Sequence, residues 1–215
     1  TRTTVRTPLW CPDALATLRD RGVRATLVIA GDGPLAGALA RRARERRLPV
    51  VFLGHVGDRE ELADLQAAAD ICLAPGPAET FGLSALEALA CGTPVVASAS
   101  SALPEILGAA GGTAADTPET FADAVQGLLD RPEALRRAAA RARAELFSWD
   151  RAVAAFLAAH EAPVGTGQAP LGVRPVVEPA RGTTTVPGAS VGMPSTPSVP
   201  SVVAASVRRR NGGAA

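Results

Sequence analysis

The chain has 215 residues, enough for one sizeable domain and a smaller segment, and its 22 basic and 21 acidic side chains leave a formal net charge of +1. A charge so near zero argues against a nucleic-acid-binding protein and against strong attraction to an anionic membrane. The three cysteines, Cys11, Cys72 and Cys91, lack metal-ligand spacing and are typical of buried reduced thiols in a reducing cytoplasm.

The first residues carry a weak structural signal. The chain starts at Thr1 rather than at a methionine, and the segment before Pro12 shows no clear pattern. Pro12 suits the first turn of a short helix that would extend to Arg19. We therefore expect residues 1–24 to be the truncated start of a domain.

From Ala25 to His160 the sequence alternates apolar, β-branched runs with stretches whose apolar positions recur at helical spacing. Strands and helices that alternate in this way predict a doubly wound, parallel, Rossmann-like α/β sheet, here with a helical C-terminal extension, over residues 25–161. The expected strands are 25–30, 50–53, 70–74, 94–98 and 112–115, and the expected helices are 35–47, 58–68, 81–91, 104–107, 117–130, 132–147 and 148–160.

From residue 162 the composition changes to Pro, Gly, Ser, Thr and Val, and the helical periodicity stops. Such a segment can bury little apolar surface, so we expect a disordered tail over residues 162–215. Arg208, Arg209 and Arg210 form a short basic cluster in this tail. Three charges could supply at most a peripheral contact with anionic lipid.

Two arginine-rich stretches, residues 41–47 and 136–143, raise the question of a nucleic-acid surface. Glutamates are interspersed in and around them, at Glu45, Glu133 and Glu145. Together with the balanced total charge, this pattern favours solvated helix faces, and no nucleic-acid partner is expected.

The carboxyl ends of the strands in such a sheet are where ligands bind. At one of them a Pro/Gly loop leads into the helix expected from Phe81, and Gly82 would allow close approach of a ligand to the backbone. The free amides and dipole of a helix N-terminus favour an anion such as a diphosphate. Glu79 and Glu87 could accept hydrogen bonds from sugar hydroxyls, each charged bond being worth about 1.5–3 kcal/mol.

This segment resembles the C-terminal domain of retaining glycosyltransferases of the two-Rossmann-domain (GT-B) architecture, family four. Their hallmark is P-x-x-E-x-F-G-L-x-x-L-E-A-x-A-x-G-x-P-V-V-A, in which seven residues separate two glutamates. The shorter family motifs G-D-G-P, F-x-G-x-V, E-L and A-D precede the hallmark and P-E follows it, in the family's order and spacing, and the resemblance covers roughly residues 25–156. The hallmark is matched at Glu79, Phe81, Gly82, Leu83, Leu86, Glu87, Ala88, Ala90, Gly92, Pro94, Val95, Val96 and Ala97.

The resemblance implies a role for each matching residue. Glu79, the catalytic candidate, would bind hydroxyls of the donor hexose near the reacting centre, and Glu87 would hold the ribose hydroxyls. Such enzymes transfer a hexose from a nucleotide-diphosphate sugar with retention, and we expect neither a metal nor another cofactor. The remaining donor contacts would be the residues near the sugar and the diphosphate, Phe81, Gly82, Leu83 and Ser84, and those against the nucleobase, His55 and Val56.

The partners implied are a nucleotide sugar of the GDP-mannose or UDP-glucose type and a glycolipid or sugar acceptor. A likeness to actinobacterial mannosyltransferases favours GDP-mannose. The acceptor would be bound by an N-terminal domain that we expect to be missing here. We expect a cytoplasmic protein, which a lipid acceptor would place at the inner face of the plasma membrane.

Two departures from the family pattern bear on activity. The G-R-x…K-G loop, whose basic side chains neutralise the leaving diphosphate, is not found, and Gln66 stands where the family often has Tyr. The charge that develops on the leaving group would then lack its compensation. We therefore expect weak donor binding, and no transfer by this chain alone.

Several residues keep a second interpretation. Gly31 starts a G-D-G-P segment that fits a tight turn better than a phosphate cradle, although Gly31 stays a candidate donor contact. His55 could line the nucleobase site or lie on the loop surface, and Glu105 could lie near the donor or be a helix-start charge. Cys91 has no partner base in the sequence, so a nucleophilic role is disfavoured.

The sequence leaves one other function open and disfavours another. The alternative to a transferase is a non-catalytic fragment that binds a nucleotide sugar. A Rossmann-type dehydrogenase is disfavoured, because the glycine-rich first turn and the acidic residue on the next strand are not found.

Overall fold

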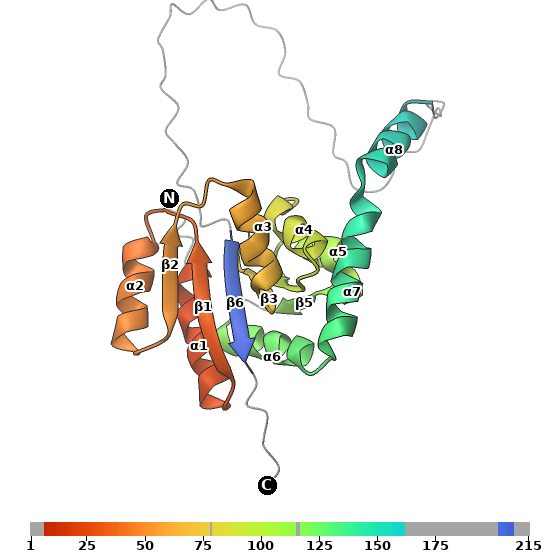
Figure 1. Ribbon diagram of the computed structural model, residues 1–215. Helices are drawn as coiled ribbons and strands as arrows, with labels where there is room; N and C mark the ends of the chain where they lie inside the picture. The colour runs from red at the N-terminus through yellow and green to blue at the C-terminus, as the bar shows by residue number, and fades with distance from the viewer. Residues whose placement is uncertain (1–6, 78, 115–116, 162–201, 209–215) are drawn as a thin grey trace, which may run out of the picture. The chain divides into compact units, whose positions relative to one another are not determined.

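The computed structural model describes residues 7–77, 79–114, 117–161 and 202–208. They form two compact units: one contains residues 7–148 and 202–208, and the other contains the helix α8 (Trp149–Glu161). The elements of the first unit (Figure 1) are η1 (Thr7–Trp10), α1 (Cys11–Asp20), β1 (Arg24–Ala30), α2 (Ala36–Glu45), β2 (Val50–Gly54), α3 (Arg59–Ala68), β3 (Ile71–Ala74), α4 (Leu83–Ala90), β4 (Val95–Ser98), α5 (Leu103–Leu107), η2 (Gly108–Ala110), β5 (Gly112–Ala114), α6 (Pro118–Leu129), α7 (Glu133–Ala144), η3 (Glu145–Phe147) and β6 (Val202–Arg208).

The expected alternation of strands and helices is confirmed, and cap residues stand at two of the helix ends. Asp58 precedes α3, and its Oδ1 accepts hydrogen bonds from the Glu60 and Glu61 amides at 2.8 and 3.0 Å. This satisfies two of the amides that a helix N-terminus leaves unpaired. Gly92, with φ 75°, follows the end of α4 as expected for a helix C-terminus.

The strands form one sheet in the order β2-β1-β6-β3-β4-β5. Parallel pairing joins β1 to β2, β3 to β4 and β4 to β5, which confirms the doubly wound parallel arrangement for these strands. Strand β6 differs: it pairs antiparallel with both β1 and β3 and separates them (Figure 1).

Strand β6 lies inside the segment for which the sequence predicts a disordered tail. Residues 202–208 instead form the strand, along which Cα partners run from Arg24 opposite Arg208 to Ala30 opposite Val202. The rest of the expected tail, residues 162–201 and 209–215, lies outside the described residues. The composition of the tail did not reveal the strand, because pairing in the middle of a sheet depends on distant partners.

The core lies on both faces of the sheet, and alternate strand residues divide between the two faces. Leu27, Ile71 and Val96 pack with α1, α2 and α6. Cys72 and Val95 pack with α4, α5 and α7 on the other face. This alternation is what strands covered on both faces require.

The arginines of α7 do not form the expected solvated face. Arg136 is 7% exposed and lies 3.3 Å from the Asp70 carboxylate. Three further arginines of α7 donate hydrogen bonds to main-chain carbonyls: Arg137 to Ala67 and Ala69, Arg141 to Ala90, and Arg143 to Glu105 and Ile106. These carbonyls stand at or just beyond the ends of α3, α4 and α5, where backbone acceptors lack intrahelical partners and the helix dipole favours a cation. Helix α7 therefore holds these helix ends in place.

Candidate functional site

The loops after β1 and β2 are joined at the carboxyl edge of the sheet. The Gly31 amide donates a hydrogen bond to the Gly54 carbonyl at 2.6 Å. Beyond Gly31, Asp32 Oδ1 accepts a hydrogen bond from the Gly33 amide at 2.8 Å, and the Gly33 carbonyl accepts one from the Ala36 amide at 3.1 Å. These bonds are those of a tight turn that leads into α2, in keeping with the turn interpretation of this segment.

The loop after β2 carries the two residues expected near a nucleobase. His55 is exposed and Val56 is half-buried. Gly54, with φ 72°, ends the strand in a conformation that favours glycine. The exposure of His55 leaves its ring accessible to a ligand at this edge.

Gly82 shapes the start of α4 in a way that no other residue could. Its φ of 74° lies in the left-handed region. A Cβ placed on Gly82 would clash with Leu103 Cδ2 and lie 3.2 Å from Glu79 Cγ. The Ala102 amide also donates to the Glu79 carbonyl at 3.1 Å, which ties the Glu79 loop to the start of α5. The backbone around Glu79 and Gly82 is thus held from two sides.

The first turn of α4 offers main-chain donors. The Ala85 and Leu86 amides donate to the Gly82 carbonyl at 3.0 and 3.1 Å. Within the part of the chain that the structure describes, the Leu83 and Ser84 amides donate to no protein acceptor. Together with the helix dipole, two such amides suit an anionic ligand.

The side chains around this helix start are open to solvent. Glu79 and Glu87 are exposed and Ser84 is half-buried. The Phe81 and Leu83 side chains are 44% and 65% exposed, unusual for large apolar groups. The structure thus places the expected donor-contacting residues from Glu79 to Glu87 on one loop and the helix that follows it.

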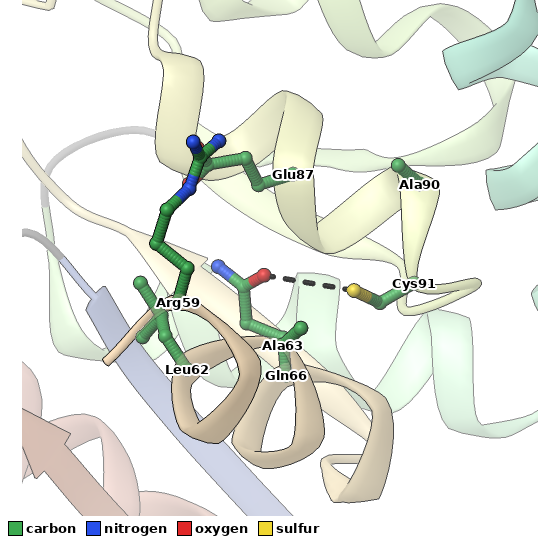
Figure 2. A pocket seen from close by; sticks show the side chains of 7 residues that line it. All are labelled: Arg59, Leu62, Ala63, Gln66, Glu87, Ala90 and Cys91. Atoms are coloured by element: carbon green, nitrogen blue, oxygen red, sulfur yellow. Dashed lines mark hydrogen bonds between the residues drawn. The ribbon is translucent and has the colours of Figure 1, made fainter. Parts of the chain in front are cut away.

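A pocket of about 220 Å³ lies between α3 and α4 and includes Glu87. Figure 2 shows Arg59 and Glu87 pointing to the same end of it. The lining residues are Arg59, Leu62, Ala63 and Gln66 from α3, and Glu87, Ala90 and Cys91 from α4 and its end. Arg59 is a lining residue that sequence reasoning missed, because only the packing of α3 on α4 brings it near Glu87.

Gln66 links the two helices behind this pocket. Its side chain is almost completely buried, and Nε2 donates to the Ser84 carbonyl at 3.4 Å while Oε1 faces Cys91 Sγ at 3.7 Å (Figure 2). The sequence identified Gln66 only as a departure from the family pattern. The structure shows that it fastens α3 to the first turn of α4.

The thiols of the chain are unsuited to nucleophilic chemistry. Burial raises the pKa of the Cys11 and Cys72 thiols from 9.0 to about 12. Partial burial, together with the nearby Glu87 carboxylate, also raises the pKa of Cys91. A raised thiol pKa lowers the thiolate fraction, which is the reactive form. This agrees with the interpretation of Cys91 as a packing residue.

Neither a metal-binding cluster nor a membrane-spanning helix is found among the described residues. No group of three or more His, Cys, Asp or Glu side chains is arranged to hold a metal ion in that part of the chain. No helix among the same residues is long and apolar enough to cross a membrane.

Comparison with known families identifies the domain. Residues 5–131 match the family described as "Glycosyl transferases group 1". The chain belongs to this family. The match covers more than half of the chain and includes both glutamates of the hallmark.

Curated relatives of this glycosyltransferase domain include mycobacterial proteins. The chain is 56% identical over 147 residues to a GDP-mannose-dependent alpha-(1-6)-phosphatidylinositol dimannoside mannosyltransferase of Mycobacterium tuberculosis. It is 40% identical over 167 residues to a D-inositol 3-phosphate glycosyltransferase of Mycolicibacterium smegmatis. The matches cover 68% and 71% of this chain but 38% and 37% of the relatives. The chain thus spans well under half the length of these relatives.

Solved structures show the same fold. The C-terminal domain of a group 1 family glycosyl transferase from Francisella tularensis matches with a TM-score of 0.55 and 26% identity, over 68% of this chain and 79% of that chain. A sucrose-phosphate synthase from Thermosynechococcus elongatus matches with a TM-score of 0.51 and 32% identity, over 62% of this chain and 37% of that one. The expected C-terminal-domain fold of a GT-B glycosyltransferase is therefore confirmed.

Proposed function

We propose that this domain binds the nucleotide-sugar donor of a retaining hexosyltransferase, with GDP-mannose as the donor. The observation that carries the proposal is the start of α4, where Gly82 holds two unpaired amides between Glu79 and Glu87. The choice of GDP-mannose is supported by the 56% identity to a relative named as GDP-mannose-dependent.

Each candidate residue has a part in this proposal. The Leu83 and Ser84 amides bind the diphosphate, where the helix dipole adds to their hydrogen bonds. Glu79 accepts hydrogen bonds from hexose hydroxyls near the anomeric carbon, and Glu87 accepts those of the ribose. The sugar and the nucleobase are further contacted by Phe81, Gly82, Gly31, His55 and Val56.

Arg59 compensates the charge of Glu87 in the pocket between α3 and α4. It is the only basic residue among the seven that line the pocket. Its guanidinium partly offsets the negative charge that Glu87 brings to this end of the pocket.

Transfer itself is proposed to need more than this chain. The relative named as a phosphatidylinositol dimannoside mannosyltransferase is covered over 38% of its length. We infer that the acceptor, a glycolipid or a sugar, is bound outside the described domain, and that the whole protein acts in the cytoplasm at the inner membrane face. Without basic groups at the leaving diphosphate, this chain alone should bind the donor weakly and transfer nothing.

The test is calorimetric titration of the chain with GDP and UDP, repeated with Glu87→Gln. The substitution keeps the shape of the side chain and removes its charge, and a charged hydrogen bond is worth about 1.5–3 kcal/mol. We expect the affinity for GDP to fall by roughly 10- to 100-fold. Glu119→Gln, an exposed helical glutamate at the start of α6, is the matched control and should leave the affinity unchanged. Equal affinity of both variants would refute the role of Glu87.

A non-catalytic role in nucleotide-sugar binding is the second candidate. It is favoured by the scarcity of basic side chains: among the residues that line the Glu87 pocket, Arg59 alone is basic, which would leave a departing diphosphate poorly neutralised. The two functions separate when the whole protein is assayed for mannosyl transfer from labelled GDP-mannose to a lipid extract. Binding without transfer would favour the second.

A further inference from the structure

The loop that carries Glu79, Phe81 and Gly82, called the donor loop below, is held on one side by α5. The Glu79 carbonyl accepts a hydrogen bond from the Ala102 amide at 3.1 Å, and Gly82 lies so close to Leu103 that a Cβ there would clash with it. Neither contact uses the ring of Phe81, which stands between these two points and is 44% exposed. The orientation of this ring therefore depends on another part of the chain.

A second aromatic ring, far away in the sequence, meets the ring of Phe81. Phe147 belongs to η3, the short turn after α7, and its ring centroid lies 6.5 Å from that of Phe81, with the two planes at 82°. Aromatic pairs favour this edge-to-face arrangement, because the positive edge of one ring faces the negative face of the other. Phe147 is half-buried, so it can hold the more exposed ring of the donor loop.

Phe147 is itself held in place by Arg143, near the end of α7. The guanidinium carbon of Arg143 lies 5.1 Å from the centre of the Phe147 ring, within the range of a cation–π contact. The same guanidinium donates hydrogen bonds to the Glu105 and Ile106 carbonyls of α5, with 2.7 Å between Nε and the Ile106 oxygen. A Cβ on Gly108, which follows α5, would lie only 3.4 Å from this guanidinium. Arg143 thus fixes Phe147 to the helix that also holds the donor loop.

We propose that Phe147 is a positioning residue of the donor site: its ring, held by Arg143, fixes the ring of Phe81 and with it the part of the donor loop that faces the sugar. The contacts with α5 hold the loop at Glu79 and Gly82, and the ring pair of Phe81 and Phe147 holds the residue between them. The proposal rests on the proposed function for the identity of the ligand, whereas the hold on the loop can be measured without nucleotide.

The place of the ring pair predicts which part of the donor it affects. Phe81 lies two residues after Glu79, the proposed hexose contact, whereas Glu87, the proposed ribose contact, lies on α4. Helix α4 is anchored in the core by its buried residues Ala85, Ala88 and Leu89. Loss of the ring pair should therefore weaken the contacts with the hexose and leave those with the nucleotide.

The ring pair itself is tested by nuclear magnetic resonance of the full chain without nucleotide. The chain has five phenylalanines, few enough for their ring resonances to be resolved and assigned through the backbone. We expect a nuclear Overhauser effect between the rings of Phe81 and Phe147 in the native chain. Its absence would overturn the proposal, and this measurement does not depend on a variant that folds.

The hold on the donor loop is tested by hydrogen exchange of the Ala102 amide, because its acceptor is the Glu79 carbonyl of that loop. Phe147→Leu removes the ring and keeps an apolar side chain, and we expect the amide to exchange about two- to tenfold faster. Phe147→Tyr keeps the ring, and Leu146→Ala alters an exposed neighbour in the same turn, so both should exchange as the native chain does. Unchanged exchange in Phe147→Leu would show that the ring pair does not hold the loop.

The role in donor binding is tested by calorimetric titration with GDP-mannose and with GDP. We expect Phe147→Leu to weaken the binding of GDP-mannose about two- to tenfold and to change the affinity for GDP by less than about twofold. A merely structural role would weaken the binding of both ligands alike, so an equal loss would overturn the proposal. Phe147→Tyr should restore the native ratio of the two affinities.

A double-variant cycle tests whether Phe147 acts through Phe81. Phe81→Leu combined with Phe147→Leu should weaken GDP-mannose binding no more than the stronger single variant does, and additive losses would overturn the proposal. If the native chain binds neither ligand while Ala102 exchange responds to Phe147→Leu, the proposed function fails and the hold of Phe147 on the loop stands. If GDP-mannose binds equally well to the native chain and to Phe147→Leu, the positioning role is refuted and the proposed function stands.

Discussion

Substitution of Gly82 by alanine should damage both the stability of the domain and its donor site. The left-handed backbone at Gly82 costs a residue with a side chain about 1–2 kcal/mol. The added methyl group would also clash with Leu103 Cδ2 and lie 3.2 Å from Leu103 Cγ, on a side chain that is fully buried. Overpacking of this kind costs about 1–3 kcal/mol. The free energy of unfolding should fall by about 2–5 kcal/mol in total.

Urea unfolding followed by circular dichroism measures this loss, and a thermal scan should show a Tm lower by roughly 5–15 °C. Gly76→Ala is the matched control, because Gly76 lies in the same loop, has no positive φ and has no atom within 4 Å of its added Cβ. We expect this control to change stability by less than about 1 kcal/mol. If Gly82→Ala lowers the free energy of unfolding no more than Gly76→Ala does, neither the left-handed backbone nor the clash with Leu103 has the cost assigned to it.

Three further predictions concern the framework around the site. Arg137→Ala removes hydrogen bonds to the Ala67 and Ala69 carbonyls at the end of α3. It should lower the free energy of unfolding in urea by about 2–3 kcal/mol, compared with less than about 0.5 kcal/mol for Arg44→Ala on an exposed helix face. Gln66→Leu should weaken GDP binding severalfold in calorimetry while the far-UV spectrum is retained, because α4 loses its tie to α3; unchanged affinity would show that the tie is unnecessary. The pKa values of the Cys11 and Cys72 thiols are raised to about 12 in the folded protein, so the unfolded chain loses these protons at a lower pH. The free energy of unfolding should therefore fall between about pH 9 and pH 12, by about 1.4 kcal/mol per pH unit for each thiol. The free energy of unfolding of Cys72→Ala in urea should depend less steeply on pH in this range. An unchanged pH dependence would contradict the raised pKa of Cys72.

Much of the fold could be predicted because its signals are local. The run from Ala25 to Ala30 is apolar and β-branched, Asp58 is a strong N-cap, and Gly92 marks a helix end. The candidate site was predictable for the same reason. Glu79 and Glu87 lie on one short segment whose glycine fixes the backbone between them.

The rest depends on contacts between residues that are far apart in the chain. The segment from Val202 is only a short apolar run after a Pro- and Ser-rich sequence, and its strand depends on pairing with β1 and β3. Arg59 joins the Glu87 pocket only because α3 packs on α4. Arg137 looks like a solvated charge until its carbonyl partners at the end of α3 are known. These features follow from the tertiary arrangement, which single-sequence periodicity does not specify.

The central claim, that the domain binds a nucleotide-sugar donor, is tested most directly by calorimetric titration of the native chain with GDP-mannose and UDP-glucose. We predict saturable binding of GDP-mannose that free GDP displaces, with weaker binding of UDP-glucose. If neither sugar nucleotide binds at millimolar concentration, the fold is present without a donor site and the account is contradicted.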